Sequence, residues 1–275
     1  MAEAEQVPAG VDITRPSPAR MYDYMLGGTH NLQVDRDATE RFRAQWPDLE
    51  DAAFANRGFL GRAARWMAAD QGIRQFVDIG SGLPTQNNTH ETIRQVTSEA
   101  RVVYVDIDPM VALYARELLT DDGATAVIQA DLRDPDSVLN HPGLRALIDF
   151  DEPVGLLMTA VLQFVSDAAD PWGLVSRYLS TVVPGSYLAL SHITGDHMPA
   201  RSVQTGVEVY ERATERAYPR TRAEIERFFK GVELVAPYPG AEPQLVNVGQ
   251  WGAEDPTVAN SDGALAFYCG VGRRP

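Results

Sequence analysis

The sequence is poor in cysteine and in long apolar runs. Cys269 is the one cysteine of 275 residues, so the chain can form neither an internal disulfide nor a metal cage of several thiolates. It lies in an apolar stretch and is predicted to be a buried small hydrophobic side chain. No apolar run approaches the roughly 18 residues that cross a bilayer, and residues 1–10 lack the apolar core of a secretion signal. We therefore expect a cytoplasmic protein with no membrane contact and no metal site.

Basic residues are also in deficit. The formal net charge is −14 at pH 7, whereas proteins that bind nucleic acids cluster Lys and Arg on their binding surface. Lys230 is the sole lysine, and it lies far from the glycine-rich residues 80–82, where a Walker phosphate loop would need one. The composition therefore argues against a nucleic-acid partner and against a Walker-type nucleotide site.

What the sequence does contain is an apolar run that breaks into a glycine turn. Residues 75–79 have the pattern of a strand buried on both faces of a parallel sheet. Gly80, Ser81 and Gly82 follow, and the missing side chains allow a tight turn close to a ligand. Pro84 and the polar residues behind it predict the opening of a helix. Strand, glycine turn and helix together are typical of the nucleotide-binding corner of an open α/β sheet.

A second strand indicates which nucleotide this corner binds. Residues 101–105 form another apolar run, which ends in Asp106. A carboxylate about twenty residues beyond the glycines, at the tip of the neighbouring strand, is placed to accept both ribose hydroxyls. A dinucleotide fingerprint needs a glycine at the sixth position of the turn, where this chain has Thr85. A nicotinamide oxidoreductase is therefore disfavoured and stays as an alternative.

The rest of the chain alternates between predicted strands and helices. Asp-Pro pairs at 108–109, 134–135 and 170–171 combine an oxygen cap with a first-turn proline, and each lies between apolar runs. Such alternation predicts an α/β fold. Further strands are expected at 125–129, 153–159, 187–191, 232–235 and 264–271, and further helices at 18–27, 35–46, 49–69 and 203–217.

The domain organisation follows from this order. We expect a single domain, with a disordered tail over residues 1–14, a helical arm or lid over 15–70, and a Rossmann-like core over 71–275. A polar insertion at about 195–220 interrupts the core. Thr221 and Glu224 have the spacing of a capping box, which predicts that a helix begins directly after this insertion.

At these motifs the chain resembles the class I S-adenosylmethionine-dependent methyltransferases. It is similar over nearly its whole length to an actinobacterial family of uncharacterised S-adenosyl methyltransferases. That similarity rests on the segment Pro16–Gly28 with His30 and Asn31 behind it, on residues 78–85, and on residues 105–109. The resemblance implies a Rossmann-like, mostly parallel sheet of seven strands with the last strand antiparallel, an N-terminal helical cover, and S-adenosyl-L-methionine as cofactor.

The resemblance also implies roles for single residues. Arg20 would pair with the methionyl carboxylate, Asp131 would take the adenine amino group, and the Leu132 backbone would lie beside the adenine ring. Alternatively, the Arg20 helix packs on the body, Asp131 caps its loop, and Phe164 is plain core. The expected cofactor contacts are Arg20, Asp78, Gly80, Ser81, Gly82, Pro84, Asp106, Ile107, Asp131, Leu132 and Ala160.

The acceptor side is expected to lie near the end of the fourth strand and under the arm. Its candidate residues are Tyr22, Tyr24, His30, Gln163, Phe164, His192 and Tyr210. His192 is the one candidate general base, because it stands at the tip of a central strand and its reference pKa suits proton transfer near neutrality. Methyl transfer to a nucleophilic acceptor needs no base, so its function as a base stays open. The acidic surface and apolar cleft favour a small-molecule acceptor, and the alternative function is a sensor that binds the cofactor without turnover.

Overall fold

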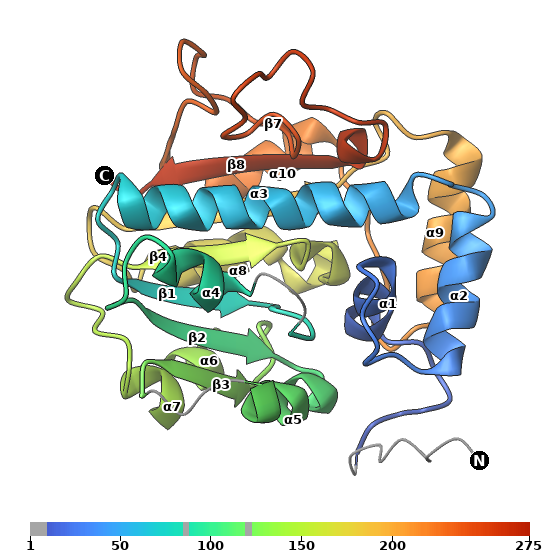
Figure 1. The fold of residues 1–275 in the computed structure, drawn as a ribbon, viewed down its shortest axis with the longest axis horizontal. Coiled ribbons are helices and arrows are strands. Elements are labelled where there is room, and N and C mark those ends of the chain that lie inside the picture. Colours follow the sequence, from blue (N-terminus) through green and yellow to red (C-terminus); the bar gives the residue numbers. More distant parts are fainter. Residues whose placement is uncertain (1–9, 85–87, 119–122) are drawn as a thin grey trace.

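The computed structural model describes residues 10–84, 88–118 and 123–275 (Figure 1). Most of the predicted tail, residues 1–14, falls on residues 1–9, which lie outside the described residues. The predicted start of a helix after Thr85 also lies outside them. Within the described ranges, no helix is both long and apolar enough to cross a membrane.

A mostly parallel sheet forms the centre of the fold. Its strands are β1 (Gln75–Ile79), β2 (Arg101–Asp106), β3 (Thr125–Gln129), β4 (Gly155–Thr159), β5 (Tyr187–Ile193), β6 (Glu233–Leu234), β7 (Val246–Asn247) and β8 (Phe267–Arg273). The strand order is β3-β2-β1-β4-β5-β8-β6, with β7 also paired to β8. Strands β1 to β5 are parallel and β8 runs antiparallel to β5, as predicted. The described residues hold eight strands rather than the expected seven, because the short β7 adds to β8.

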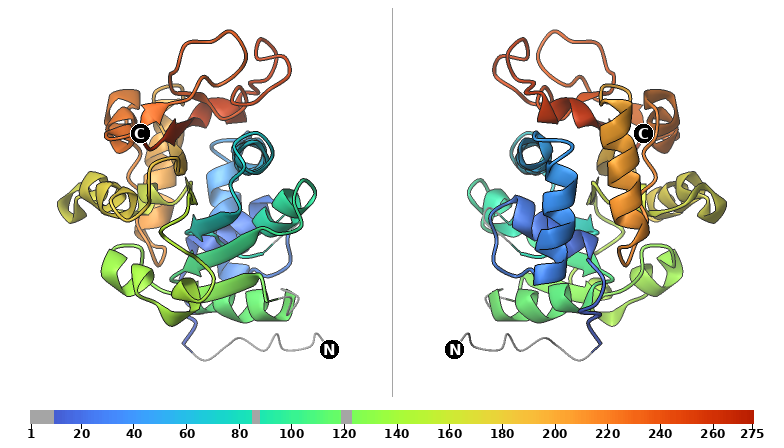
Figure 2. Two further views of the ribbon diagram at one scale, coloured as in Figure 1. Left: turned by 90° about the vertical axis from the view of Figure 1, so that its left-hand side faces the viewer. Right: turned by 90° about the vertical axis from the view of Figure 1, so that its right-hand side faces the viewer.

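Helices cover both faces of this sheet. They are α1 (Pro18–Met25), α2 (Gln33–Arg43), α3 (Leu49–Ala69), α4 (Thr89–Arg94), α5 (Pro109–Leu118), α6 (Pro135–Leu139), α7 (Pro142–Arg145), α8 (Pro171–Leu179), α9 (Ala200–Glu211) and α10 (Arg222–Glu226). In the side views α3 and α8 lie on opposite sides of the sheet (Figure 2). Helices α1, α2 and α9 gather beyond the carboxyl ends of the parallel strands (Figure 1).

Successive residues of each strand pack into two separate hydrophobic cores, one on each face of the sheet, because strand side chains alternate between faces. Phe76 of β1 belongs to the core under α3, whereas its neighbour Val77 belongs to the core under α8. Every residue of β1 and of β4 is buried, which is the pattern of a sheet covered on both faces. Cys269 of β8 is fully buried, as predicted. The two cores fix the strand ends rigidly at one edge of the sheet.

Most predicted helix boundaries are confirmed to within a few residues. Helix α3 has the predicted bounds, and α5, α6 and α8 each begin at the proline of an Asp-Pro pair. The box of Thr221 and Glu224 caps α10 as expected. The helix of the insertion was placed too late at 203–217, since α9 begins at Ala200 and ends at Glu211. The residues after it form an irregular segment that lies against the carboxyl edge of the sheet.

Candidate functional site

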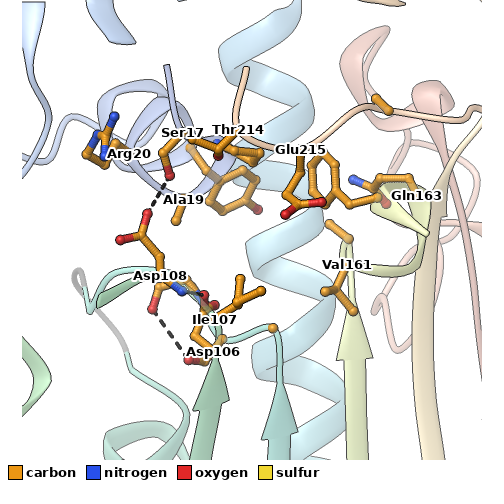
Figure 3. Close-up of a pocket in the computed structure, with 18 of the residues that line it drawn as sticks. Ser17, Ala19, Arg20, Asp106, Ile107, Asp108, Val161, Gln163, Thr214 and Glu215 are labelled. Atoms are coloured by element: carbon orange, nitrogen blue, oxygen red, sulfur yellow. Dashed lines mark hydrogen bonds between the residues drawn. The ribbon is translucent and has the colours of Figure 1, made fainter. Parts of the chain in front are cut away.

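A cavity of about 320 Å³ opens at the carboxyl ends of the parallel strands. In open α/β sheets this edge is where ligands bind, and the volume lies within the range of small-molecule sites. Its walls come from the chain before α1, from α1, α2 and α3, from the strand ends, and from the segment that follows α9 (Figure 3). One cavity therefore joins the predicted arm, the glycine turn and the insertion.

The glycine turn forms one wall of the cavity. Gly80 and Gly82 have φ angles of 72° and 68°, a region that side chains other than glycine rarely adopt. The Gly80 amide donates to the Val105 carbonyl at 2.7 Å, which ties the turn to β2. A Cβ atom on Gly80 would lie 2.1 Å from Cγ2 of Val161, whereas one on Gly82 would meet nothing within 4 Å. Gly80 thus has two separate reasons to be glycine, and Gly82 has one.

Asp106 stands at the end of β2 beside this turn. Its Oδ2 accepts from the Gly82 amide at 2.8 Å and its Oδ1 from the Asp108 amide at 2.9 Å. Burial raises the pKa of Asp106 to about 6, although these two hydrogen bonds act in the opposite direction. Ile107, next in the chain, also lines the cavity and is 42% exposed. The Ile107 amide is a third backbone donor to this carboxylate, whose two oxygens together offer about four acceptor positions, so one remains for a ligand hydroxyl.

Asp131 and Leu132 line the cavity at the end of β3, as predicted. Asp131 is paired with Arg133 at 2.8 Å, and Arg133 also reaches Glu215 at 3.0 Å. Partial burial raises the pKa of Asp131, but the hydrogen bonds and charge of Arg133 outweigh it and hold the pKa below its usual value. The Leu132 carbonyl accepts from the Tyr178 hydroxyl at 2.9 Å. This end of the cavity therefore presents an ionised carboxylate on a fixed loop.

Arg20 lines the cavity, yet its guanidinium is held by the protein itself. Nε donates to Oδ2 of Asp35 at 2.7 Å, and Nη2 donates to the carbonyls of Arg15 at 2.7 Å and Asp12 at 3.2 Å. Both members of the ion pair are almost completely buried. Ser17 precedes α1, and its hydroxyl donates to Asp108 at 2.6 Å instead of capping the helix. The ion pair joins α1 to α2, and the Ser17 hydroxyl joins the start of α1 to the residues after β2.

The acceptor-side candidates divide into two groups. Tyr22, Gln163, Phe164 and Tyr210 all line the cavity, and Ala160 lies beside them at the end of β4. Tyr24 and His30 do not line it. The Tyr24 hydroxyl donates to Glu40 at 2.8 Å, and the His30 ring packs on Tyr114 with 4.2 Å between centroids.

His192 is fully buried and lies outside the cavity. Its Nε2 is 2.7 Å from Nη1 of Arg220, and its ring stacks on Phe228. Burial lowers the pKa of His192 to about 3, and the charge of Arg220 acts in the same direction. A neutral imidazole enclosed in this way has no access to a ligand in the cavity, which argues against the predicted function as a general base.

Asp78 and Pro84 support the turn from outside the cavity. Oδ2 of Asp78 accepts from the Thr89 hydroxyl at 2.6 Å beneath the turn. Burial raises the pKa of Asp78, while the Thr89 hydrogen bond and the charge of Arg57 oppose that rise. Pro84 borders a small separate hollow beside Gly82. Neither residue lines the main cavity, and both lie next to the glycine turn.

Sequence patterns did not single out several residues of the walls. Arg57 lines both the cavity and the small hollow beside the glycine turn. The one sequence signal that could have indicated Arg57 was the polar pair at 56–57, which interrupts the apolar stripe of α3. Other wall residues that were not predicted include Phe42, Trp46, Asn56, Arg133, Glu215 and Phe267. Across the described ranges, no group of three or more His, Cys, Asp or Glu residues is arranged to hold a metal ion.

Comparisons with known proteins agree with this geometry. The model of the S-adenosyl methyltransferase family matches residues 4–275. A DUF574-family protein from Streptomyces avermitilis is 38% identical over 96% of this chain and 99% of that one, with a TM-score of 0.88. A proposed methyltransferase from Thermobifida fusca is 38% identical over 98% and 99% of the two chains, with a TM-score of 0.89.

A more distant likeness concerns the fold alone. Human N-acetylserotonin methyltransferase, solved in complex with S-adenosylmethionine, is 14% identical over 92% of this chain and 62% of that one, with a TM-score of 0.50. No curated protein sequence matches the chain. The full-length family match and the two 38% identical structures decide the assignment. The chain belongs to the S-adenosyl methyltransferase family and is a methyltransferase that uses S-adenosylmethionine.

Proposed function

We propose that the protein methylates a small, largely apolar molecule held in the same cavity as the cofactor. The observation that carries this proposal is the composition of the two ends of the cavity. One end has the glycine turn, Asp106 and Asp131, and the other end is aromatic. There the ring of Tyr210 lies 5.5 Å from that of Phe164 and 6.5 Å from that of Phe42, centroid to centroid. A sensor that only binds the cofactor would need no second, aromatic end.

The residues fit the cofactor. The Gly80 turn approaches so closely to Val161 that no side chain fits, and the remaining acceptor position of Asp106 suits a ribose hydroxyl. Asp131 is the proposed partner of the adenine amino group. For the methionyl carboxylate we propose Arg57, because it lines both the cavity and the small hollow beside the glycine turn.

The chemistry places few demands on the protein. S-adenosylmethionine supplies an electrophilic methyl group, so a lone pair of the acceptor forms the new bond to carbon while the pair of the broken C–S bond stays on sulfur. The chain has to align the acceptor and exclude water. Apolar residues of α2 and α3 line the cavity and exclude water from it. The proton of a methylated N–H or O–H group is proposed to leave to solvent, since His192 lies outside the cavity.

The carboxylate of Asp106 is expected to decide cofactor affinity. Asp106→Ala should weaken binding of S-adenosylhomocysteine about 100-fold, because a hydrogen bond to a charged group is lost. Calorimetric titration with S-adenosylmethionine, S-adenosylhomocysteine and NAD measures this. Asp136→Ala removes an exposed carboxylate outside the cavity and should bind like the wild type. Binding of NAD instead of the adenosyl ligands would refute the assignment of the site.

Cofactor affinity should also fall in mild acid. Because the pKa of Asp106 is raised to about 6, only about one molecule in ten keeps this carboxylate ionised at about pH 5. The ionised form is the one that accepts the ribose hydroxyl, so the Kd for S-adenosylhomocysteine should rise about tenfold between about pH 7.5 and pH 5. Asp106→Asn, measured in parallel, should bind weakly and lack this pH step. If the Kd rises equally in the wild type and in Asp106→Asn, the pH dependence belongs to a titrating group other than Asp106.

A further inference from the structure

Gln163 has an unusual environment for an amide. It lies on the short 3-10 turn Leu162–Phe164 after β4, lines the cavity, and is only 6% exposed. Its backbone carbonyl accepts from the Tyr218 amide at 2.7 Å. Its side-chain oxygen, however, is buried and has no hydrogen-bond partner among the described residues. Buried polar groups in native proteins almost always have a partner, so this one indicates a missing donor.

Tyr22 and Asn56, which also line this end of the cavity, use their polar groups within the protein. The Tyr22 hydroxyl donates to the Ala53 carbonyl at 2.9 Å and accepts from Nδ2 of Asn56 at 3.0 Å. Oδ1 of Asn56 in turn accepts from the hydroxyl of Ser191. This closed set leaves the amide of Gln163 available to a ligand. Figure 3 shows it at the edge of the cavity, near Val161 and Glu215.

The surfaces around Gln163 are flat and aromatic. Phe164 and Tyr210 pack with their rings tilted by 54°, and Phe42 meets Tyr210 edge to face. Burial raises the pKa of Tyr210, and the neighbouring Tyr22 acts in the same direction, so its phenol stays neutral. Aromatic walls favour planar ligands. The carboxylate of Glu215 is already paired with Arg133 at 3.0 Å, so a charged ligand would lose its hydration here without gaining an unpaired counter-ion.

We infer that the methyl acceptor is a neutral, planar aromatic molecule whose N–H or O–H group donates to the amide oxygen of Gln163. This inference rests on the proposed function, since it assigns the aromatic end of the cavity to the acceptor. Gln163 is then a positioning residue, which orients the acceptor and takes no part in forming or breaking the bonds of the methyl group. An acceptor that lacks the donor would leave the amide oxygen buried and unpaired, and it would bind more weakly for that reason.

Indole and 1-methylindole test this, because 1-methylindole carries a methyl group in place of the N–H donor, and Gln163→Leu separates the loss of the donor from the added bulk. Each is titrated calorimetrically into protein saturated with S-adenosylhomocysteine. Indole should bind about tenfold more tightly than 1-methylindole, the ratio expected for one buried hydrogen bond. In Gln163→Leu the ratio should fall below about twofold, mainly because indole binds less tightly, while S-adenosylhomocysteine binds as in the wild type. Gln204→Leu, which changes an exposed glutamine of α9, should keep the wild-type ratio.

The outcomes separate this inference from the proposed function. Equal binding of the two probes by the wild type, or the same ratio in Gln163→Leu, would overturn the role of the amide. Binding of neither probe, with S-adenosylhomocysteine still bound, would overturn the aromatic acceptor and leave cofactor binding intact. Failure to bind S-adenosylhomocysteine would overturn the proposed function and this inference with it.

Discussion

Replacing Asp35 with alanine should lower the free energy of unfolding by about 3–5 kcal/mol, which is the range for breaking a buried ion pair. Asp35 is fully buried. Its Oδ2 accepts from Nε of Arg20 at 2.7 Å and from the Leu32 amide at 2.8 Å, and its Oδ1 accepts from the Ser17 amide at 2.9 Å. Alanine would leave the Arg20 charge buried without its counter-ion and two backbone donors without acceptors. Urea denaturation followed by circular dichroism measures the loss.

Asp37 provides the matched control on the same helix. Its carboxylate is exposed and bonds only the Gln33 side chain in the same turn, so Asp37→Ala should change stability by less than about 0.5 kcal/mol. A double-mutant cycle of Arg20→Met and Asp35→Ala should show strong coupling. Each single variant leaves one buried charge without its counter-ion, whereas the double variant leaves none. A loss below about 1 kcal/mol for Asp35→Ala would contradict the view that this ion pair stabilises the packing of α1 on α2.

Gly80→Ala should destabilise the protein by roughly 2–5 kcal/mol and abolish cofactor binding. The left-handed backbone costs about 1–2 kcal/mol for a residue with a Cβ atom, and overpacking costs about 1–3 kcal/mol more. The overpacking follows from the position of Val161, whose Cγ2 would lie 2.1 Å from the new Cβ. Denaturant titration without ligand and calorimetry with S-adenosylhomocysteine measure the two effects.

Gly82→Ala separates the two causes. It shares the left-handed φ of Gly80, but its Cβ would meet nothing within 4 Å, so about 1–2 kcal/mol should be lost. Shortening Val161 in Gly80→Ala/Val161→Ala should recover part of the difference, because the collision is then relieved while the backbone cost stays. Equal losses for Gly80→Ala and Gly82→Ala would show that the contact with Val161 does not constrain the turn.

Local signals were enough to predict the sheet and its covering helices. The Asp-Pro pairs mark the starts of α5, α6 and α8 because the cap and the proline act within one turn. The apolar runs mark the strands, and the glycine turn with Asp106 could be placed at the strand ends because parallel strands end at one edge. The two-residue β7 was missed, since so short a strand has no periodicity of its own.

The side chains of the site depend on contacts that no local pattern shows. His192 was correctly placed near the tip of β5, but the alternation of strand side chains turns it into the core under Phe228, while its neighbour Ile193 lines the cavity. Arg20 lines the cavity, but no local pattern shows that its Nε donates to Asp35, 15 positions away. Such choices between partners are made by tertiary packing.

The position of β8 also has a consequence for synthesis on the ribosome. β8 lies between β5 and β6 in the sheet, although it begins at Phe267, long after β5 has ended at Ile193. At about 5–20 residues per second, translation needs roughly 4–15 s to cover that distance. During this interval the edge of β5 lacks the strand that finally covers it, and an unpaired edge invites pairing with other chains. The nascent protein is therefore exposed to misassociation at the edge of β5 until β8 has been made and pairs with it.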